Sequence, residues 1–184
     1  MDAIENLQNA YGFYRDKWQW DDAAKLFAAN GTREIAQRGV YVGRDHVRRS
    51  FELDGPAGIR QGEVAEHFLY QHAIHVADDG RTARARVREL SLLGGYGKRA
   101  EVEGEVAENV FVKEAGVWKI QSEHQYTTFQ ADYTKGWSQG SMPIAGPSRE
   151  IPADKPPTEK YAAFPEYFVP PFHYTNPVSG TPIH

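Results

Sequence analysis

Residues 74–90, IHVADDGRTARARVREL, decide the fold class of this chain because they read as two strands joined by a tight turn. After the turn, small or apolar residues alternate with arginines, which is the period of two expected of a strand with one buried face. Asp79-Gly80 suits the positive φ angles of a hairpin turn. The segment therefore predicts an antiparallel hairpin.

The same period continues on both sides of this hairpin. We predict strands at 63–77, 82–94, 101–113 and 117–129, with turns at 94–97 and 114–116. Before them, helices are predicted at residues 2–18, near 21–29 and near 44–53, with an extended stretch at 33–42. Helices followed by a run of long antiparallel strands predict an α+β fold, in which a curved sheet wraps around the N-terminal helices.

Proline divides the chain, since ten of its eleven prolines lie at or after Pro143. We predict a folded domain over residues 1–137 and an extended, proline-rich C-terminal arm over 138–184. The arm is rich in aromatic residues, which usually need a surface to pack on. It is expected to lie across its own domain; the alternatives are that it reaches a neighbouring subunit or closes over a site.

Composition excludes several classes of protein. The 184 residues include 21 Lys and Arg against 25 Asp and Glu, a formal net charge of −4, which disfavours nucleic-acid binding. The absence of cysteine excludes disulfides, thiolate nucleophiles and thiolate-bound metals. No apolar run is long enough to span a membrane, and the N-terminus does not read as a secretory signal. We therefore expect a cytoplasmic protein without nucleic-acid or membrane partners.

Aligning the two later turns predicts which side chains share a face of the sheet. One face then carries a charge ladder, which we interpret as solvated or facing a neighbouring subunit: Arg84, Arg86 and Arg88 opposite Glu101, Glu103 and Glu105. Exposed pairs of this kind contribute roughly 0.2–1 kcal/mol each. The glutamates also cancel the positive charge that a phosphate site would need.

The opposite face is predicted to be apolar and small in its middle: Ala83, Ala85, Val87, Val102, Gly104, Val106, Val110, Val112, Trp118 and Ile120. The same alignment places Glu89, Glu108, His124 and Tyr126 on it. Ionisable groups on a buried face are costly unless paired, so this cluster predicts a pocket with acid–base chemistry. The alternative is a closed, purely structural hydrogen-bonded network. A single bulge would turn part of this face outward.

The first strand can be phased in two ways. A regular turn makes Ile74 face Ala85 and points His72 and Tyr70 inward. A bulge between Gln71 and Ile74 would instead bring His67, Leu69 and Gln71 in. Without a bulge His67 and His72 lie on opposite faces, so metal binding is weakly indicated. No phosphate loop or dinucleotide fingerprint is present, and we expect neither metal nor cofactor.

Several stretches together resemble the SnoaL-like branch of the nuclear-transport-factor-two-like superfamily. They are GRDHVRRSF (43–51), IHVADDGRTARAR (74–86) and GVWKIQSEHQYTTF (116–129), in this order after two helices. The resemblance covers about residues 3–130. It implies a cone-shaped α+β barrel in which helices close one side of a strongly bent sheet around a deep apolar pocket. Members include polyketide cyclases, dehydratases, ketosteroid isomerase and non-enzymatic binding modules, so the fold alone does not give the function.

The C-terminal arm adds a narrower resemblance. DYTKGW (132–137), GPSREIPADKPP (146–157) and PPFHYTNPVSG (170–180) are similar to catabolic members that act on lignin-derived diarylpropane or phenylcoumaran compounds. The resemblance implies a cofactor-free lyase that releases a hydroxymethyl group as formaldehyde and leaves a stilbene. The alternatives are a dehydratase, isomerase or cyclase on a polycyclic or steroid-like substrate, and a non-catalytic binding or assembly module. We also expect a homo-oligomer, a dimer or a trimer.

The candidate site residues follow from the predicted apolar face. Glu108 or His124 would assist loss of a benzylic hydroxyl group, and a base would take the proton of the hydroxymethyl group. The full set of catalytic candidates is Glu108, His124, Tyr126, Glu89, His67 and His72. Substrate rings would be held by aromatic side chains, for which the candidates are Tyr14, Trp18, Tyr70 and Trp118.

Overall fold

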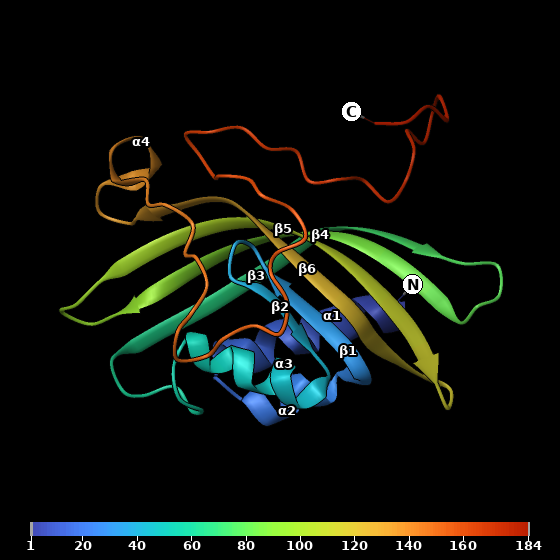
Figure 1. Ribbon diagram of the computed structural model, residues 1–184, viewed down its shortest axis with the longest axis horizontal. Coiled ribbons are helices and arrows are strands. Elements are labelled where there is room, and N and C mark those ends of the chain that lie inside the picture. Colours follow the sequence, from blue (N-terminus) through green and yellow to red (C-terminus); the bar gives the residue numbers. More distant parts are fainter. Residues whose placement is uncertain (1, 184) are drawn as a thin grey trace.

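The computed structural model describes residues 2–183 and consists of one bent sheet with helices on its concave side (Figure 1). The helices on that side are α1 (Asp2–Asp16), α2 (Trp20–Lys25) and α3 (Arg44–Ser50), followed by the short 3₁₀ helix η1 (Phe51–Leu53). The helix α4 (Gly136–Gly140) follows the last strand. Within the described residues, no helix is long and apolar enough to cross a bilayer.

The sheet has six strands in the order β2-β1-β6-β5-β4-β3. Their bounds are β1 Phe27–Ile35, β2 Gly39–Val42, β3 Glu63–Val76, β4 Thr82–Gly95, β5 Ala100–Glu114 and β6 Val117–Asp132. The strand β1 runs parallel to β6, and all other neighbours are antiparallel. The long strands β3–β6 correspond to the four predicted ones, and the α+β prediction is confirmed.

An aromatic core closes one end of the space between the helices and the sheet. Trp20 stacks on Phe51 with a centroid distance of 5.3 Å, and the Tyr11 and Phe27 rings meet edge to face at 5.8 Å. The core continues on the sheet through small side chains: Ala83, Ala85 and Val87. Small residues let α1 lie close to the strands. At Gly12, an added Cβ would lie 2.7 Å from the Cδ1 atom of Leu69.

Bulges decide which residues of the long strands face the helices. In β3 the pairing with β4 shifts between Tyr70 and Ala73, where Gln71 has a φ of 54°. The bulged alternative for this strand is therefore the observed one: His67 and Leu69 face inward, while Ile74 still pairs with Ala85. Gln71 itself is exposed, contrary to that alternative.

The predicted register of β5 against both neighbours is wrong. Lys113 pairs with Trp118, where Val112 was expected, and Arg88 pairs with Val106, where Glu103 was expected. Each error is an odd number of residues, and an odd slip moves every side chain of a strand to the other face. The face of β4 was predicted correctly. Glu101, Glu103 and Glu105 therefore lie on the concave face with Glu89, and the charge ladder with the arginines does not exist.

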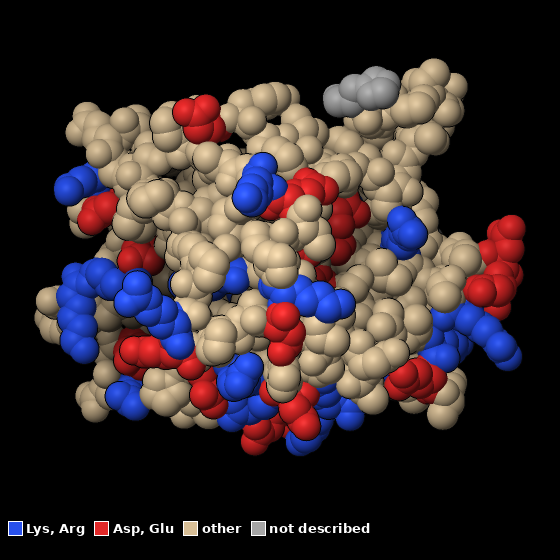
Figure 2. All heavy atoms as spheres, in the orientation of Figure 1, with Lys and Arg blue, Asp and Glu red and all other residues tan. Residues whose placement is uncertain are grey.

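The C-terminal arm crosses the outer, convex face of its own sheet (Figure 1). It first follows the edge strand β2, where Lys155 pairs with Val40. The Tyr161 hydroxyl then accepts a hydrogen bond from the backbone N–H of Thr127 at 3.0 Å, and the Phe168 ring stacks on Tyr161. Figure 2 shows acidic and basic side chains interspersed on this view of the molecule, not gathered into one patch of a single sign.

Candidate functional site

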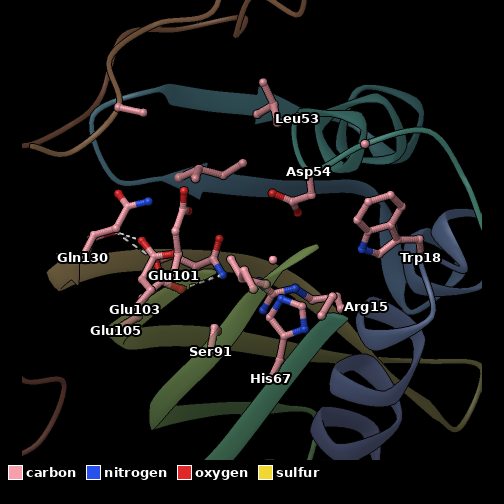
Figure 3. A pocket seen from close by; sticks show the side chains of 18 of the residues that line it. Arg15, Trp18, Leu53, Asp54, His67, Ser91, Glu101, Glu103, Glu105 and Gln130 are labelled. Carbon is pink, nitrogen blue, oxygen red and sulfur yellow. Dashed lines mark hydrogen bonds between the residues drawn. The ribbon is translucent and has the colours of Figure 1, made fainter. Parts of the chain in front are cut away.

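A cavity of about 410 Å³ lies between the helices and the concave face of the sheet. Carboxyl groups gather at one end of it and Trp18 stands at the other, with His67, Ser91 and Arg15 between them (Figure 3). Asp54, which follows η1, projects into the cavity from the side opposite the carboxyl-bearing strand β5 (Figure 3). The site is therefore polar within, unlike the apolar pocket that the family resemblance implied.

Two adjacent rows of side chains across the strands organise this part of the sheet. In one row the cross-strand partners are His67, Ser91, Glu103 and Gln130; in the next they are Leu69, Glu89, Glu105 and Thr127. Strands are spaced about 4.8 Å apart, so the Cα atoms of His67 and Glu103, two strands apart, are separated by roughly 10 Å. That separation leaves room for one ring-sized group between an imidazole and a carboxyl.

His67 is held by Asp16, the last residue of α1. One carboxylate oxygen, Asp16 Oδ1, accepts both the backbone N–H of His67 at 2.8 Å and its Nδ1 at 2.9 Å. A carboxylate can only accept, so Nδ1 donates the hydrogen of this bond, and in the neutral imidazole Nε2 is the acceptor atom. Both side chains are buried, and His67 lines the cavity. The arrangement is an oriented imidazole able to act as a base.

Arg15 and Glu89 form a buried ion pair beside His67. Arg15 Nη1 donates to both oxygens of Glu89, at 2.9 and 2.8 Å, and the Ser91 hydroxyl donates to Glu89 Oε1 at 3.0 Å. Burial raises the pKa of the Glu89 carboxyl, but the charges of Arg15 and His67 and the hydrogen bonds from Arg15 and Ser91 together outweigh it, so this pKa lies below its usual value. Glu89 is therefore an ionised partner of Arg15 and not a free acid.

Glu103 and Glu105 have the opposite character. Burial raises the pKa of Glu103 to about 7, and the charges of Glu89 and Asp54 add to the effect. Burial, together with the charge of Glu103, also holds the pKa of Glu105 well above its usual value. The Thr127 hydroxyl lies 3.0 Å from Glu105 Oε1 and 3.3 Å from Glu103 Oε1. These carboxyls can hold a proton near neutral pH, which an acid catalyst must do.

A buried network fixes the wall behind this pair. Glu123 accepts from the Tyr11 hydroxyl at 2.8 Å and from Arg33 Nε at 3.0 Å. Arg33 Nη2 donates to Gln125 Oε1 at 3.1 Å, and Gln125 Nε2 donates in turn to Glu105 Oε2 at 3.4 Å. Arg33 is thereby neutralised by Glu123, and the Gln125 amide has only one orientation.

The structure brings two of the predicted site residues to the cavity, His67 and Trp18. Glu89 also faces inward, but it lies behind Arg15 and is 2% exposed. Tyr14 and Trp118 pack against the aromatic core, and neither lines the cavity. His72 lies at the bulge of β3, where burial lowers the pKa of its imidazole.

The remaining predicted residues lie on the outer face of the sheet. Glu108 pairs with His124 across β5 and β6, and the rings of His124 and Tyr126 stack at 3.8 Å beneath the arm. Their expected position on the concave face with Glu89 is wrong, because the register slip of β5 and a bulge of β6 between Ile120 and Ser122 reverse the faces. Tyr70, also on the outer face, is 38% exposed.

The outer face also contains a strongly shifted histidine. Burial lowers the pKa of His124 to about 4, so the ring is neutral near pH 7. Its Nε2 lies 3.4 Å from Glu34 Oε1, yet the geometry gives no hydrogen bond. His124 is therefore a packed ring under the arm.

Sequence reasoning missed Asp16, Asp54, Glu103, Glu105 and Thr127. For the two glutamates a signal existed, since Glu101, Glu103 and Glu105 alternate along one strand, but the register assigned them to the solvent. Asp16 sits at the end of a helix and is far from His67 in sequence, so no local pattern links them. In the described part of the chain, no three His, Cys, Asp or Glu side chains are placed to hold a metal ion.

A family model for the SnoaL-like domain matches residues 1–124. The chain belongs to the SnoaL-like family. This match confirms the resemblance seen in the sequence, and the cone-like architecture agrees with it. Comparison with curated proteins found no match.

Solved structures of the same fold are similar to this SnoaL-like chain at low sequence identity. One, named "Putative Scytalone Dehydratase", from Novosphingobium aromaticivorans, has a TM-score of 0.65 and 21% identity over 81% of this chain and 93% of its own. A hexachlorocyclohexane dehydrochlorinase, LinA type 2, has a TM-score of 0.61 and 16% identity over 71% and 86%. ActVI-ORFA from Streptomyces coelicolor has a TM-score of 0.59 and 18% identity over 68% and 95%. At these identities the likeness establishes the fold alone.

Proposed function

We propose that this chain is a lyase that works without a cofactor, by acid–base elimination in the cavity. The observation that carries the proposal is the His67–Asp16 pair, which presents a free imidazole nitrogen to a cavity whose far end holds carboxyl groups. An oriented base and a protonated acid in one cavity are the requirements for removing a proton and a leaving group from the same molecule.

For the substrate we propose a phenolic 1,2-diarylpropane-1,3-diol or a close relative, as the resemblance of the arm implies. In the first step, an acid protonates the benzylic hydroxyl group, water leaves, and loss of the phenolic proton gives a quinone methide. In the second, His67 Nε2 removes the proton of the terminal hydroxymethyl group. The carbon–carbon bond then breaks and formaldehyde leaves. The electron pair of the broken bond forms the stilbene double bond and restores the aromatic ring. The phenol regains its proton, so the products are stilbene, formaldehyde and water.

The substrate itself supplies the electron sink in this mechanism, because the phenol ring accepts and returns the electron pair. The protein supplies orientation and proton transfer. Trp18 at one end of the cavity offers a surface on which an aromatic ring can stack. Positioned acid and base groups typically contribute about 10²–10⁴-fold each to the rate.

A second candidate is a dehydratase, which uses the same residues but stops after loss of water. The names of two similar structures favour elimination chemistry in general, since one is assigned as a scytalone dehydratase and the other is a dehydrochlorinase. A binding module without catalysis is the third candidate. The open cavity beside His67 counts against an assembly module with a closed structural network, and the oriented His67–Asp16 pair favours catalysis over binding alone, because binding does not require a base.

The test is incubation of the purified protein with a panel of phenolic 1,2-diarylpropane-1,3-diols, with formaldehyde and the stilbene chromophore measured together. We expect equal amounts of both products, and a loss of kcat of about 10²–10⁴-fold in His67→Ala. His46→Asn is the matched control, since His46 is an exposed histidine on α3 outside the cavity lining. A dehydrated product without formaldehyde would favour the second candidate. Full activity of His67→Ala would overturn the site.

A further inference from the structure

The contacts of Thr127 require an additional proton. Glu103 and Glu105, if both were ionised as usual, would have no proton to donate to its hydroxyl oxygen. Its Oγ1 lies 3.0 Å from Glu105 Oε1 and 3.3 Å from Glu103 Oε1. A hydroxyl group has one hydrogen, so it can donate to only one of these oxygens. The other contact is favourable only if that carboxyl is protonated and donates to the hydroxyl oxygen. Two carboxylates around one threonine hydroxyl would leave an uncompensated repulsion.

No cation takes the place of that proton. Among residues 2–183, neither Glu103 nor Glu105 forms an ion pair, although eleven other acidic side chains lie within ion-pair distance of a basic side chain. The two nearby guanidinium groups are engaged already, Arg15 with Glu89 and Arg33 with Glu123. The remaining partner of Glu105 is the neutral amide of Gln125.

The charged and titratable groups around the pair come from every element that surrounds the cavity. They are Arg15 on α1, Arg33 on β1, Asp54 after η1, His67 on β3, Glu89 on β4, Glu101 on β5 and Tyr161 on the arm, and the cavity lining adds Arg38, Glu63, Lys98 and Arg99. Arg15 and Arg33 are each paired with a carboxylate of their own, and the charges of Glu89 and Asp54 oppose ionisation of the two glutamates. A buried negative environment favours retention of a proton.

We infer that Glu103 and Glu105 hold one proton between them through the Thr127 hydroxyl, and that this shared proton is the acid of the cavity. The shared proton follows from the contacts alone; its use as the acid rests on the proposed function. Glu103 and Glu105 are then catalytic residues, and Thr127 is a positioning residue that links them. The proton passes to the leaving hydroxyl oxygen, water departs, and the pair is left with two negative charges until a proton returns from His67 by way of solvent or product.

This arrangement restricts the substrate. A group that departs from the carboxyl end is expected to be neutral before it accepts the proton, because a carboxylate or phosphate there would lie beside Glu103, Glu105 and Asp54. The proposal therefore assigns a neutral hydroxyl group to this end of the cavity. Substrates carrying an anionic substituent at the benzylic position are expected to be excluded.

The proton can be detected without any substrate. We expect an infrared band of a protonated carboxyl in the wild type at pH 6, which disappears above about pH 8 and is absent from Glu105→Gln. Unfolding at pH 6 should release about one more proton in the wild type than in Glu105→Gln, because an unfolded Glu with a pKa of about 4.3 is ionised at that pH. Glu66→Gln, which removes an exposed carboxyl on β3, should match the wild type.

Stability gives a second readout with a definite sign. A carboxyl whose pKa is raised in the folded state binds its proton more tightly there than in the unfolded chain. Its stabilising contribution is therefore full below the unfolded pKa of about 4.3 and is lost as the pH rises through about 7. In Glu103→Gln and Glu105→Gln, where the amide is a neutral substitute, this loss between pH 4.3 and 7 should shrink.

Activity then tests the role of the proton. We expect Glu103→Gln and Glu105→Gln to lose about 10²–10⁴-fold in kcat while remaining folded, and Thr127→Val to move the alkaline limb of the kcat pH profile. Equal proton release and the same infrared spectrum in wild type and variants would overturn the shared proton. Detection of the proton without turnover of any diaryl diol would leave the shared proton in place and overturn only the proposed function.

Discussion

Among the described residues, the two buried arginines of the cavity lining each have a dedicated carboxylate partner. Arg15 is matched by Glu89 and Arg33 by Glu123, all four with side chains no more than 6% exposed. Moving such charges out of water is costly, and the pairing with additional hydrogen bonds offsets that cost. Glu103 and Glu105 lack such partners, and a bound proton takes the place of the missing counter-charge. The difference between a structural carboxylate and a candidate acid therefore lies in the neighbours and not in the residue type.

Removing one member of a buried pair should be far more damaging than removing both. We expect Glu89→Leu to lower the free energy of unfolding by about 3–5 kcal/mol, because it leaves the Arg15 guanidinium buried without a counter-charge. The double variant Arg15→Met with Glu89→Leu should recover most of that loss. Urea denaturation measures both. Glu66→Gln, in the exposed pair with Lys17, should change stability by no more than about 1 kcal/mol.

At the scale of the element, bulges aim the side chains of the long strands. The pairing of β5 with β6 shifts between Gly104 and Glu105, and Thr128 is the additional residue on β6. Gly104 pairs with Phe129 there, and the Phe129 ring covers the place that a Cβ of residue 104 would occupy. On the other side of the shift, Glu105 pairs with Thr127, so this bulge helps to bring the two carboxyls and the hydroxyl together.

A methyl group at position 104 should disturb this junction. We expect Gly104→Ala to lower the melting temperature through overpacking against Phe129, with a cost of about 1–3 kcal/mol. Adding Phe129→Ala should relieve the clash, so the two substitutions should be strongly non-additive. Additive effects in thermal unfolding would contradict the proposed close packing of these residues.

Near residue 173, the arm contacts the sheet through the carboxylate of Glu108. Glu108 accepts from Arg86 Nη1 at 2.5 Å, and its other oxygen lies 2.6 Å from His173 Nδ1 on the arm. We expect Glu108→Gln to expose residues 165–183 to limited proteolysis while reducing kcat far less than Glu103→Gln does. A loss of turnover as large as that of Glu103→Gln would move the catalytic site to the outer face.

At the scale of the whole molecule, the two faces of the sheet respond to pH in opposite directions. The Glu103 carboxyl on the concave face loses its stabilising contribution as the pH rises through about 7. His124 on the outer face is neutral when folded, with a pKa lowered by burial from 6.5 to about 4. Because the unfolded chain takes up this proton first, stability is lost as the pH falls from 6.5 toward 4.

Replacing His124 with a ring that cannot be protonated should remove the loss of folding stability at acidic pH. We expect His124→Phe, which keeps the stack on Tyr126, to flatten the fall in unfolding free energy between pH 6.5 and 4 by an amount of order 3 kcal/mol at most. Urea denaturation at several pH values measures this slope. An unchanged slope in the variant would mean that His124 is protonated in the folded state at pH 6.

Self-association remains a prediction for the whole molecule. The outer face of β3 carries exposed apolar side chains, among them Val64 at 52% and Phe68 at 48% exposure. We expect a homo-oligomer in light scattering at the concentrations used for assay, and a shift toward monomer in Phe68→Glu. A wild-type monomer would contradict the prediction, as would an oligomer unaffected by substitutions on this face.

The sequence by itself determined the fold class, the hairpin at 74–90, the helices before the sheet and the family. These depend on local signals, namely the period of two, the Asp-Gly turn and short motifs in order. The sequence also predicted which side chains of β4 face inward. Side chains alternate between the two faces of a strand, so an apolar face fixes the direction of each one. Both phases of β3 were anticipated, although only the structure selects the bulged one.

Only the tertiary structure decided where the candidate site lies. The face of β5 depends on its register against two neighbours, and one residue of slip exchanges Glu103 and Glu105 with Glu108. Register is set by loop geometry, bulges and packing against α1. None of these produces a periodic pattern in the amino-acid sequence of the strand. The contact of Asp16 with His67 likewise joins a helix end to a strand that is distant in the chain. Alternation reveals which residues of one strand share a face, but the site depends on which strands and helices meet, and that is settled by long-range packing.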